Sequence, residues 1–544
     1  LAVLLIGIAG CGEGSSPPGG GTVPTTEGSQ AKADESPAEA DPVVTLEKFR
    51  AGSKRVVGEY RQLFIDDHLV AHMRGVKRVL NQAKRHPHNP LMVGDRPWEG
   101  TYVYLFGTVL YDEAEQMFKM WYKSWRLMST ELLNYAVSKD GIRWDKPALG
   151  INSQGDNVVG VRDAHGVIHQ PEDPNPDRRY KRLEYLGAGS YSWGAAFSPD
   201  GIRWITLPDP QGPAGFKKVL HGAENCSVVY DQQSGRYVAF PKLYQRVRNK
   251  YQKKGFERRS VTVAFSDDFV NWSQPQFILV PDARDDELAA QRVAAARGIL
   301  ADDDGPQWYN AQFYGMCGFP YEGMYLGLLW VFDISGGGGN KKFQAGGEDG
   351  PIQVELVSSR DLLHWQRVAD RGLILPRGPD GTWDGGIIWT SNRPVIVGDE
   401  IRIYYGGLAY PHGGAHFTDP GPREKKVRVK GGIGLATLRL DGWVSIDAGK
   451  EEGTLTTKPL VFEGKGLVIN AKAPEGSVAV EILDEAGKPL SGLGKTDCDA
   501  FRGDAIRHRV SWRGKSDLRE LAGKIVRLRF HLRRAKLYSF VFPG

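Results

Sequence analysis

The chain has 544 residues with 70 Lys and Arg against 65 Asp and Glu, and 41% of its residues are hydrophobic, a composition typical of globular proteins. A net charge of +5 over this length does not indicate nucleic-acid binding, which needs a concentrated basic stripe. The 68 Gly and 32 Pro favour many turns and short strands. We therefore expect an all-β protein that binds no nucleic acid.

The N-terminal segment begins with an apolar run, residues 1–10, that is too short for a transmembrane helix of about 20 residues. It ends in Ile8-Ala9-Gly10-Cys11, which resembles the lipobox of bacterial lipoproteins, in which the Cys carries the lipid. Residues 12–45 contain Pro, Gly, Ser and Thr clusters and predict a flexible linker. We expect residues 1–11 to be a signal-peptide remnant. Cys11 would then anchor the protein, by lipid alone, at the outer membrane or the periplasmic or extracellular face of the bacterial cell envelope.

A repeated heptapeptide, S-x-D-x-x-x-W, dominates the next part of the chain. It occurs at residues 138–144, 198–204, 266–272 and 359–365, with a degenerate fifth copy at 440–443. An Asp in a turn accepts backbone hydrogen bonds, and the Trp fastens the returning strand. Because four strands fit between successive copies, the repeat predicts a five-bladed β-propeller over residues 46–446. A β-sandwich with repeated hairpins is the alternative.

Two stretches interrupt or follow this repeat. An Ala-rich segment at 285–297 predicts one short helix. After residue 446 the repeat stops, and apolar residues alternate around 478–482 and 526–532, which predicts a β-sandwich over residues 447–544. Many Lys and Arg lie between 501 and 536. They are typical of a solvated sheet face, and the alternative is a patch for anionic glycans or lipid headgroups.

Four features together resemble the five-bladed propeller glycoside hydrolases, the superfamily that contains families 32, 43 and 130. They are His88-Asn89-Pro90-Leu91 followed by Pro97-Trp98-Glu99-Gly100, the S-x-D-G-x-x-W repeat, Trp383-Asp384-Gly385 followed by residues 398–407, and the C-terminal β-rich tail. The resemblance implies a carbohydrate substrate. Sialidases share a related repeat with one more residue between Asp and Gly, and they are the lesser interpretation.

Glycoside hydrolysis needs two carboxyl groups on either side of the bond that breaks. The family order implies Asp163 on blade two as the transition-state stabiliser and Glu224 on blade three as the general acid. The matching position on blade one falls in Tyr104-Leu105-Phe106, which carries no acid. Replacements are Glu99, Asp384 and the pair Asp66-Asp67, whose adjacent carboxylates could ionise unequally. A structural role in capping strands or turns is the alternative for each of them.

Other side chains are candidates for binding a sugar in the same central funnel. They are Trp98, His165, Asn225, Tyr309, Trp383, Trp389 and His412. Cys226, Cys317 and Cys498 have no CxxC spacing and indicate neither a zinc site nor a disulfide framework. We predict no metal at the active site and no required cofactor. A structural calcium ion is allowed, although Asp302-Asp303-Asp304-Gly305 lacks the full calcium-loop pattern.

The sequence thus favours an envelope-anchored glycoside hydrolase, acting as a monomer on a poly- or oligosaccharide through paired carboxylates in the propeller funnel. Two alternatives stay open. One is a propeller that binds glycans without catalysis, which the missing acid on blade one supports. The other is a glycoside phosphorylase, which would need a cluster of Arg and His for phosphate.

Overall fold

The computed structural model describes residues 55–544 except 59, 101, 126–130, 152, 154, 162–163, 188, 248–255, 301–307, 337–348 and 413–430. The expected lipobox with Cys11, the linker 12–45, the cation candidate 302–305 and Asp163 lie outside the described residues. Within Phe49–Gly544 the chain forms one compact unit. No helix among the described residues is long and apolar enough to cross a membrane.

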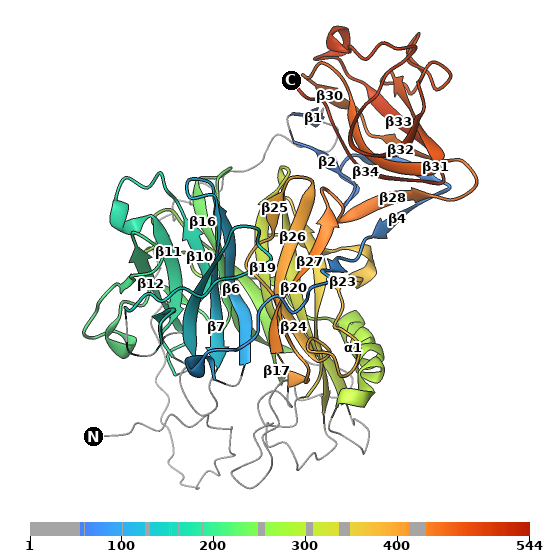
Figure 1. The fold of residues 1–544 in the computed structure, drawn as a ribbon. Helices are drawn as coiled ribbons and strands as arrows, with labels where there is room; N and C mark the ends of the chain where they lie inside the picture. The colour runs from blue at the N-terminus through green and yellow to red at the C-terminus, as the bar shows by residue number, and fades with distance from the viewer. Residues whose placement is uncertain are drawn as a thin grey trace, which may run out of the picture. The chain divides into compact units, whose positions relative to one another are not determined.

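The protein is all-β, as predicted from its composition and repeat (Figure 1). Three successive sheets run in chain order. The first contains β6 (Tyr102–Asp112), β7 (Met117–Trp125), β8 (Leu132–Ser138) and β9 (Val158–Gly160). The second contains β10 (Ala164–His169), β11 (Tyr180–Tyr185), β12 (Ser192–Ser198), β13 (Ile205–Thr206) and β14 (Leu220–His221). The third contains β15 (Cys226–Asp231), β16 (Arg236–Val247), β17 (Phe256–Ser266) and β18 (Gln276–Leu279).

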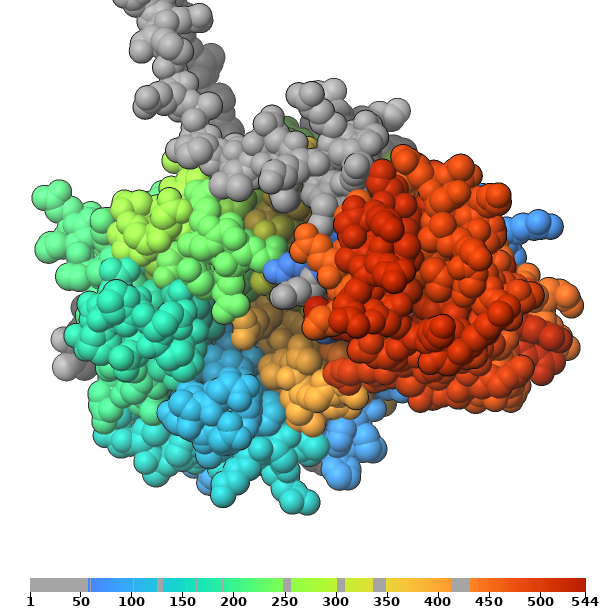
Figure 2. All heavy atoms as spheres, turned by 90° about the horizontal axis from the view of Figure 1, so that it is seen from above, coloured from blue at the N-terminus to red at the C-terminus, as the bar shows by residue number. Residues whose placement is uncertain are grey.

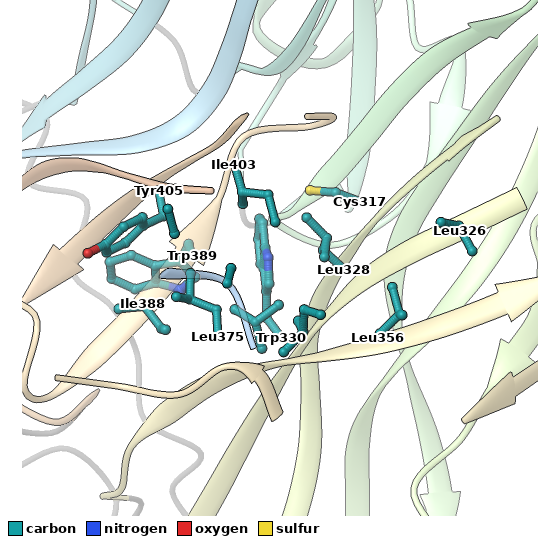
Figure 3. Close-up of a cluster of buried hydrophobic side chains, with 14 of the residues drawn as sticks. Cys317, Leu326, Leu328, Trp330, Leu356, Leu375, Ile388, Trp389, Ile403 and Tyr405 are labelled. Atoms are coloured by element: carbon teal, nitrogen blue, oxygen red, sulfur yellow. The ribbon is translucent and has the colours of Figure 1, made fainter. Parts of the chain in front are cut away.

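A fourth, ten-stranded sheet has two halves. The first half contains β19 (Trp308–Tyr321), β20 (Met324–Gly336), β21 (Ile352–Ser359), β22 (Trp365–Arg367) and β23 (Leu373–Leu375). The second contains β24 (Ile387–Thr390), β25 (Val395–Val397), β26 (Glu400–Leu408), β27 (Gly431–Arg439) and β5 (Lys84–Arg85). One parallel pair, Ile352 with Ile387, joins the halves. The sheet connection is therefore narrow, although apolar side chains from both halves pack into one core (Figure 3).

Hydrogen bonds between sheets follow one another in a circle. Trp121 Nε1 donates to the Gly201 carbonyl (2.7 Å), which joins the first sheet to the second. Trp193 Nε1 donates to Ala223 (3.1 Å) and Ser227 Oγ to Met316 (2.6 Å). The backbone N–H of Asn392 donates to Gly107 (3.0 Å) and returns to the first sheet. In Figure 2 these segments accordingly follow one another in the order of the chain colours.

The repeated heptapeptide forms the same turn at each of its four full copies. In the third copy, the Ser266 hydroxyl accepts from the Phe269 N–H, and Asp268 Oδ1 accepts from the two following amides at 2.7–2.8 Å. The fourth residue of the turn has a positive φ in every copy, at Gly141, Gly201, Phe269 and Leu362. The Trp272 indole then donates back to Phe269 (3.1 Å). The turn is thus held by local bonds that the S-x-D-x-x-x-W pattern supplies by itself.

The last sheet combines both ends of the described chain. It contains β2 (Gln62–Leu63), β3 (Val70–Arg74), β4 (Val76–Leu80), β28 (Val444–Ala448), β29 (Gly453–Thr457), β31 (Val468–Leu483), β32 (Phe501–Arg509), β33 (Arg527–Arg533) and β34 (Ala535–Val541). Nearby, β1 (Arg55–Val57) pairs in parallel with β30 (Leu460–Phe462). In the same nine-stranded sheet β4 pairs with β28, Leu80 with Val444. The strands β2, β3 and β4 therefore share a sheet with C-terminal strands, although the sequence places them in the segment 46–446.

The predicted helix is present as α1 (Ala283–Ala295), which starts at an Asp282 capping box. The basic face of β33 pairs with acids of its own sheet region. Arg529 lies 3.1 Å from Glu481, and His531 Nδ1 lies 3.2 Å from Glu452. His531 and Glu481 are buried and Arg529 is half-buried, so part of this face is enclosed by its own ion pairs.

Candidate active site

Aromatic side chains from four strands meet where the first strands of the sheets approach one another. Phe106 of β6 stacks on the His165 ring of β10, with centroids 4.8 Å apart and planes at 17°. It also contacts Trp389 of β24 at 4.8 Å and lies parallel to Tyr314 of β19 at 6.4 Å. The Trp389 side chain is buried, and its indole N–H has no hydrogen-bond partner among the described residues. These rings form an aromatic floor.

One side of this floor carries a lysine and a glutamate. Lys123 of β7 places Nζ 2.7 Å from His165 Nε2 and 3.6 Å from Glu131 Oε2. Glu131 immediately precedes β8, and its other oxygen accepts a short hydrogen bond from the Tyr104 hydroxyl. Burial, opposed by Glu131, lowers the pKa of Lys123 to about 8. Burial and the Lys123 charge hold the pKa of His165 well below its usual value, so His165 is neutral and its Nε2 accepts a hydrogen bond from the lysine ammonium group.

The opposite side carries a second glutamate. Glu224, which lies just before β15, forms an ion pair with buried Lys242 of β16. The ammonium group of Lys242 is 5.0 Å from the centre of the Tyr314 ring, and the guanidinium of Arg259 is 5.8 Å from it. Burial alone would raise the pKa of Glu224, but Lys242 and Arg259 outweigh it and lower this pKa. Glu224 is therefore ionised at neutral pH.

The two carboxylates act on the same buried groups. The pKa of Tyr314 is raised by burial, and both Glu224 and Glu131 contribute to the shift. The pKa of His165 also responds to both carboxylates. In the contacts themselves, Lys123 joins Glu131 to His165, and Lys242 joins Glu224 to the Tyr314 ring. Because Phe106 lies parallel to both His165 and Tyr314, each carboxylate is connected through one lysine to the same aromatic floor.

The backbone beside Glu224 is strained. Asn225 has φ of 95°, a conformation that costs a non-glycine residue about 1–3 kcal/mol and is common at functional sites. Its side-chain amide donates to the Tyr314 carbonyl at 2.8 Å. The side-chain hydroxyl of Tyr314 lies 3.3 Å from His412 Nε2. Asn225 thus fixes the position of Glu224 relative to the floor.

Glu99 and Asp384 have contacts of a structural kind. Glu99 is fully buried and accepts from Tyr122 Oη (2.6 Å), with Lys146 Nζ at 2.7 Å. Asp384 is 2% exposed and accepts from Arg85 Nε (2.7 Å) and Tyr405 Oη (2.9 Å). Each carboxylate is enclosed by its partners, which differ from the groups on the aromatic floor.

Asp66 and Asp67 follow β2 at the edge of the C-terminal sheet. Asp66 forms a two-bond ion pair with Arg360 (2.7 and 3.1 Å), and Asp67 pairs with Arg78. The contact of Asp66 connects this sheet to the turn at 359–365, and that of Asp67 stays within the sheet, on β4. The structure does not bring either of them to the aromatic floor.

Only some of the predicted sugar-binding residues lie at the aromatic floor. His165, Asn225, Trp389 and His412 meet at the floor. Trp98 instead donates to Asn157 (2.8 Å), and Trp383 stacks on Tyr405. Tyr309 is half-buried in β19 opposite Ser335.

The sequence reasoning missed five residues of the site. They are Lys123, Glu131, Lys242, Arg259 and Tyr314. A signal was present for the lysines, because Lys123 and Lys242 each follow apolar residues inside a long strand, where a charge is costly to bury. Glu131 carries no such signal. The described residues contain no group of three or more His, Cys, Asp or Glu arranged to hold a metal ion.

No protein-family model and no curated protein matches the sequence. Among solved structures, the chain is similar to an N-acetylgalactosamine deacetylase from F. plautii in complex with blood group B trisaccharide. The two are 15% identical, and the alignment covers 72% of this chain and 96% of the other at a TM-score of 0.36.

The chain is also similar to two further solved structures. A β-1,2-mannobiose phosphorylase from Listeria innocua is 11% identical, with 66% and 96% coverage and a TM-score of 0.39. A thermostable family-43 glycoside hydrolase is 11% identical, with 67% and 95% coverage and a TM-score of 0.38.

Proposed function

We propose that this protein is a carbohydrate-active enzyme that cleaves glycosidic bonds, with Glu131 and Glu224 as its two carboxylates. The observation that carries this proposal is geometric: Lys123 connects Glu131 to His165, and Lys242 connects Glu224 to Tyr314. Both rings lie parallel to Phe106 on the aromatic floor. Phe106, His165 and Trp389 are buried beneath this site, and Tyr314 is the partly exposed ring of the floor that can meet a sugar face. Glycosidic cleavage uses two carboxyl groups on either side of the bond. Glu131 takes the place of the acid that the sequence lacks at Tyr104.

The ionised state of Glu224 defines its role. A general acid needs a pKa raised towards the working pH, whereas Lys242 and Arg259 lower this one. We therefore assign to Glu224 a role that requires negative charge: attack on the anomeric carbon, activation of water, or stabilisation of the positive charge that develops on the sugar ring. This differs from the general-acid role that the family order implies.

The proposal includes the architecture and location expected from the sequence. Three separate sheets and two halves of a fourth, linked in a circle, support five propeller blades. The nine-stranded antiparallel sheet, which combines strands from both ends of the described chain, supports an accessory β-sandwich. The lipobox at Cys11 supports an anchor in the bacterial envelope.

A glycan-binding protein without catalysis is the second candidate. The ion pair between Glu224 and Lys242 favours it, because a carboxylate that is already neutralised by a buried lysine is poised for binding rather than for attack.

One experiment separates the candidates. The protein is incubated with a panel of glycans and aryl glycosides, with and without phosphate, beside the variants Glu131→Gln and Glu224→Gln and the surface control Glu113→Gln. Catalysis predicts that each site variant loses about 100-fold or more of the activity while the control keeps it. Unchanged activity in both site variants would contradict the proposal. Binding by all forms without sugar release would support the second candidate, and strict dependence on phosphate would indicate a phosphorylase.

A further inference from the structure

Lys123 is a buried lysine beside a carboxylate of the proposed site. Its side chain is 2% exposed, and its ammonium group lies 5.1 Å from the centre of the Phe106 ring. Burying an ammonium group is costly unless nearby groups compensate. The Lys123 ammonium group lies 2.7 Å from His165 Nε2 and 3.6 Å from Glu131 Oε2.

The groups around Lys123 determine where its ammonium group donates a hydrogen bond and which charge it attracts. Tyr104 and Phe106 face it from β6, His165 faces it from β10, and Glu131 faces it from the residue before β8. On the Tyr314 side of the floor, Lys242 lies 5.0 Å from the centre of the tyrosine ring and pairs with Glu224. Because His165 is neutral, its Nε2 accepts a hydrogen bond from the Lys123 ammonium group. The positive charge of this group attracts the Glu131 carboxylate.

This arrangement depends on pH in an accessible range. The pKa of Lys123 is about 8, since burial lowers it and Glu131 only partly opposes the shift. Above this pH the neutral amine still reaches His165, but it no longer attracts the carboxylate of Glu131. The Tyr104 hydroxyl then remains as the described partner that holds Glu131.

We infer that Lys123 is a positioning residue: its ammonium group holds the Glu131 carboxylate beside Tyr104, and loss of its proton in mildly alkaline solution releases Glu131 and lowers activity. The inference rests on the proposed function.

A double-mutant cycle tests the contact without any substrate. Thermal unfolding midpoints are measured for the wild type, Lys123→Met, Glu131→Gln and the double variant at about pH 7 and about pH 9.5, on either side of the Lys123 titration. We expect the two substitutions to be non-additive at the lower pH and additive at the higher pH. Equal coupling at both pH values, or none at the lower one, would overturn the inference. If no glycan is cleaved, the proposed function fails while this cycle still decides whether Lys123 holds Glu131.

The pH profile of kcat/KM tests the consequence for catalysis. We expect the wild-type profile to fall above about pH 8, and Lys123→Arg, which keeps its charge, to move that fall upward by about one pH unit or more.

A matched control lies in the same strand. Lys119 is also buried and pairs with Asp112 at 2.9 Å. Burial alone would lower the pKa of Lys119, but Glu115 and Asp112 outweigh it and raise this pKa. Lys119→Arg should leave the alkaline fall in place. A fall that stays unchanged in Lys123→Arg, or that moves equally in Lys119→Arg, would show that Lys123 does not position the site.

Discussion

Replacement of Glu99 by Ala should destabilise the protein without a specific loss of catalysis. Its carboxylate accepts from the backbone amides of Asp95 (2.8 Å) and Arg96 (2.9 Å), and from Tyr122 Oη at 2.6 Å. It also pairs with Lys146 Nζ at 2.7 Å. Both charged side chains are nearly inaccessible, with 0% exposure for Glu99 and 5% for Lys146.

The magnitude follows from what the substitution leaves behind. Removing one partner of a buried ion pair costs about 3–5 kcal/mol. Lys146 keeps a second partner, the largely exposed carboxylate of Asp95 at 2.7 Å, so we expect the lower end, about 3 kcal/mol. Glu99→Gln retains an acceptor for the two amides and should cost about 1–2 kcal/mol.

The assay is equilibrium unfolding in urea, combined with kcat/KM on the best glycan from the panel. Glu113→Ala, at an exposed position of the turn after β6, serves as the control and should change stability by less than about 0.5 kcal/mol. A loss below about 1 kcal/mol for Glu99→Ala would refute the structural role. So would a large loss of kcat/KM at unchanged stability, because that result would place Glu99 in the chemistry.

Three further predictions follow from individual contacts. Asp66→Ala should lose about 1 kcal/mol or less of stability and no activity, since Asp66 pairs with the half-exposed Arg360; a selective loss of activity would contradict this. Asp268→Ala should lose about 1 kcal/mol. Backbone hydrogen bonds outweigh burial and lower the pKa of Asp268 to about 2, so its contribution to stability is present above the ordinary pKa of 3.8 and disappears as the pH falls to about 2. The check is urea unfolding of the wild type and the variant at a series of pH values. A difference in stability that stays constant with pH would refute this contribution of the ionised Asp268. Finally, Lys242→Met should raise the pKa of Glu224 and shift the acidic fall of kcat/KM to higher pH, because an ionised Glu224 is lost as the pH falls through its lowered pKa. An unmoved acidic limb would show that Glu224 does not act in its ionised form.

The sequence by itself determined the local structure. The S-x-D-x-x-x-W turn depends on hydrogen bonds that span two or three residues, such as those of Asp268, so the heptapeptide identifies it without tertiary information. The same holds for α1, whose capping box is formed by Asp282 and Asp285. The all-β class follows from many such turns between alternating strands.

Tertiary structure decided which of the acids meet. Glu131 reaches the aromatic floor because Tyr104 and Lys123, on two neighbouring strands, bind its carboxylate. Glu99 and Asp384 have equally suggestive sequence settings, but each is enclosed by partners from other segments. Burial and ion pairing set the charge of each carboxylate, and both depend on residues far away in the chain.

The placement of the N-terminal strands shows the same limit. Nothing local distinguishes β4 from a strand of the first blade, yet Leu80 pairs with Val444. Strand pairing joins residues at any separation in the chain, and the buried partner that selects one pairing is known only once the chain has folded. The sequence therefore determined the turns, the strands and the fold class, whereas folding decided which strands share a sheet and which charges share a site.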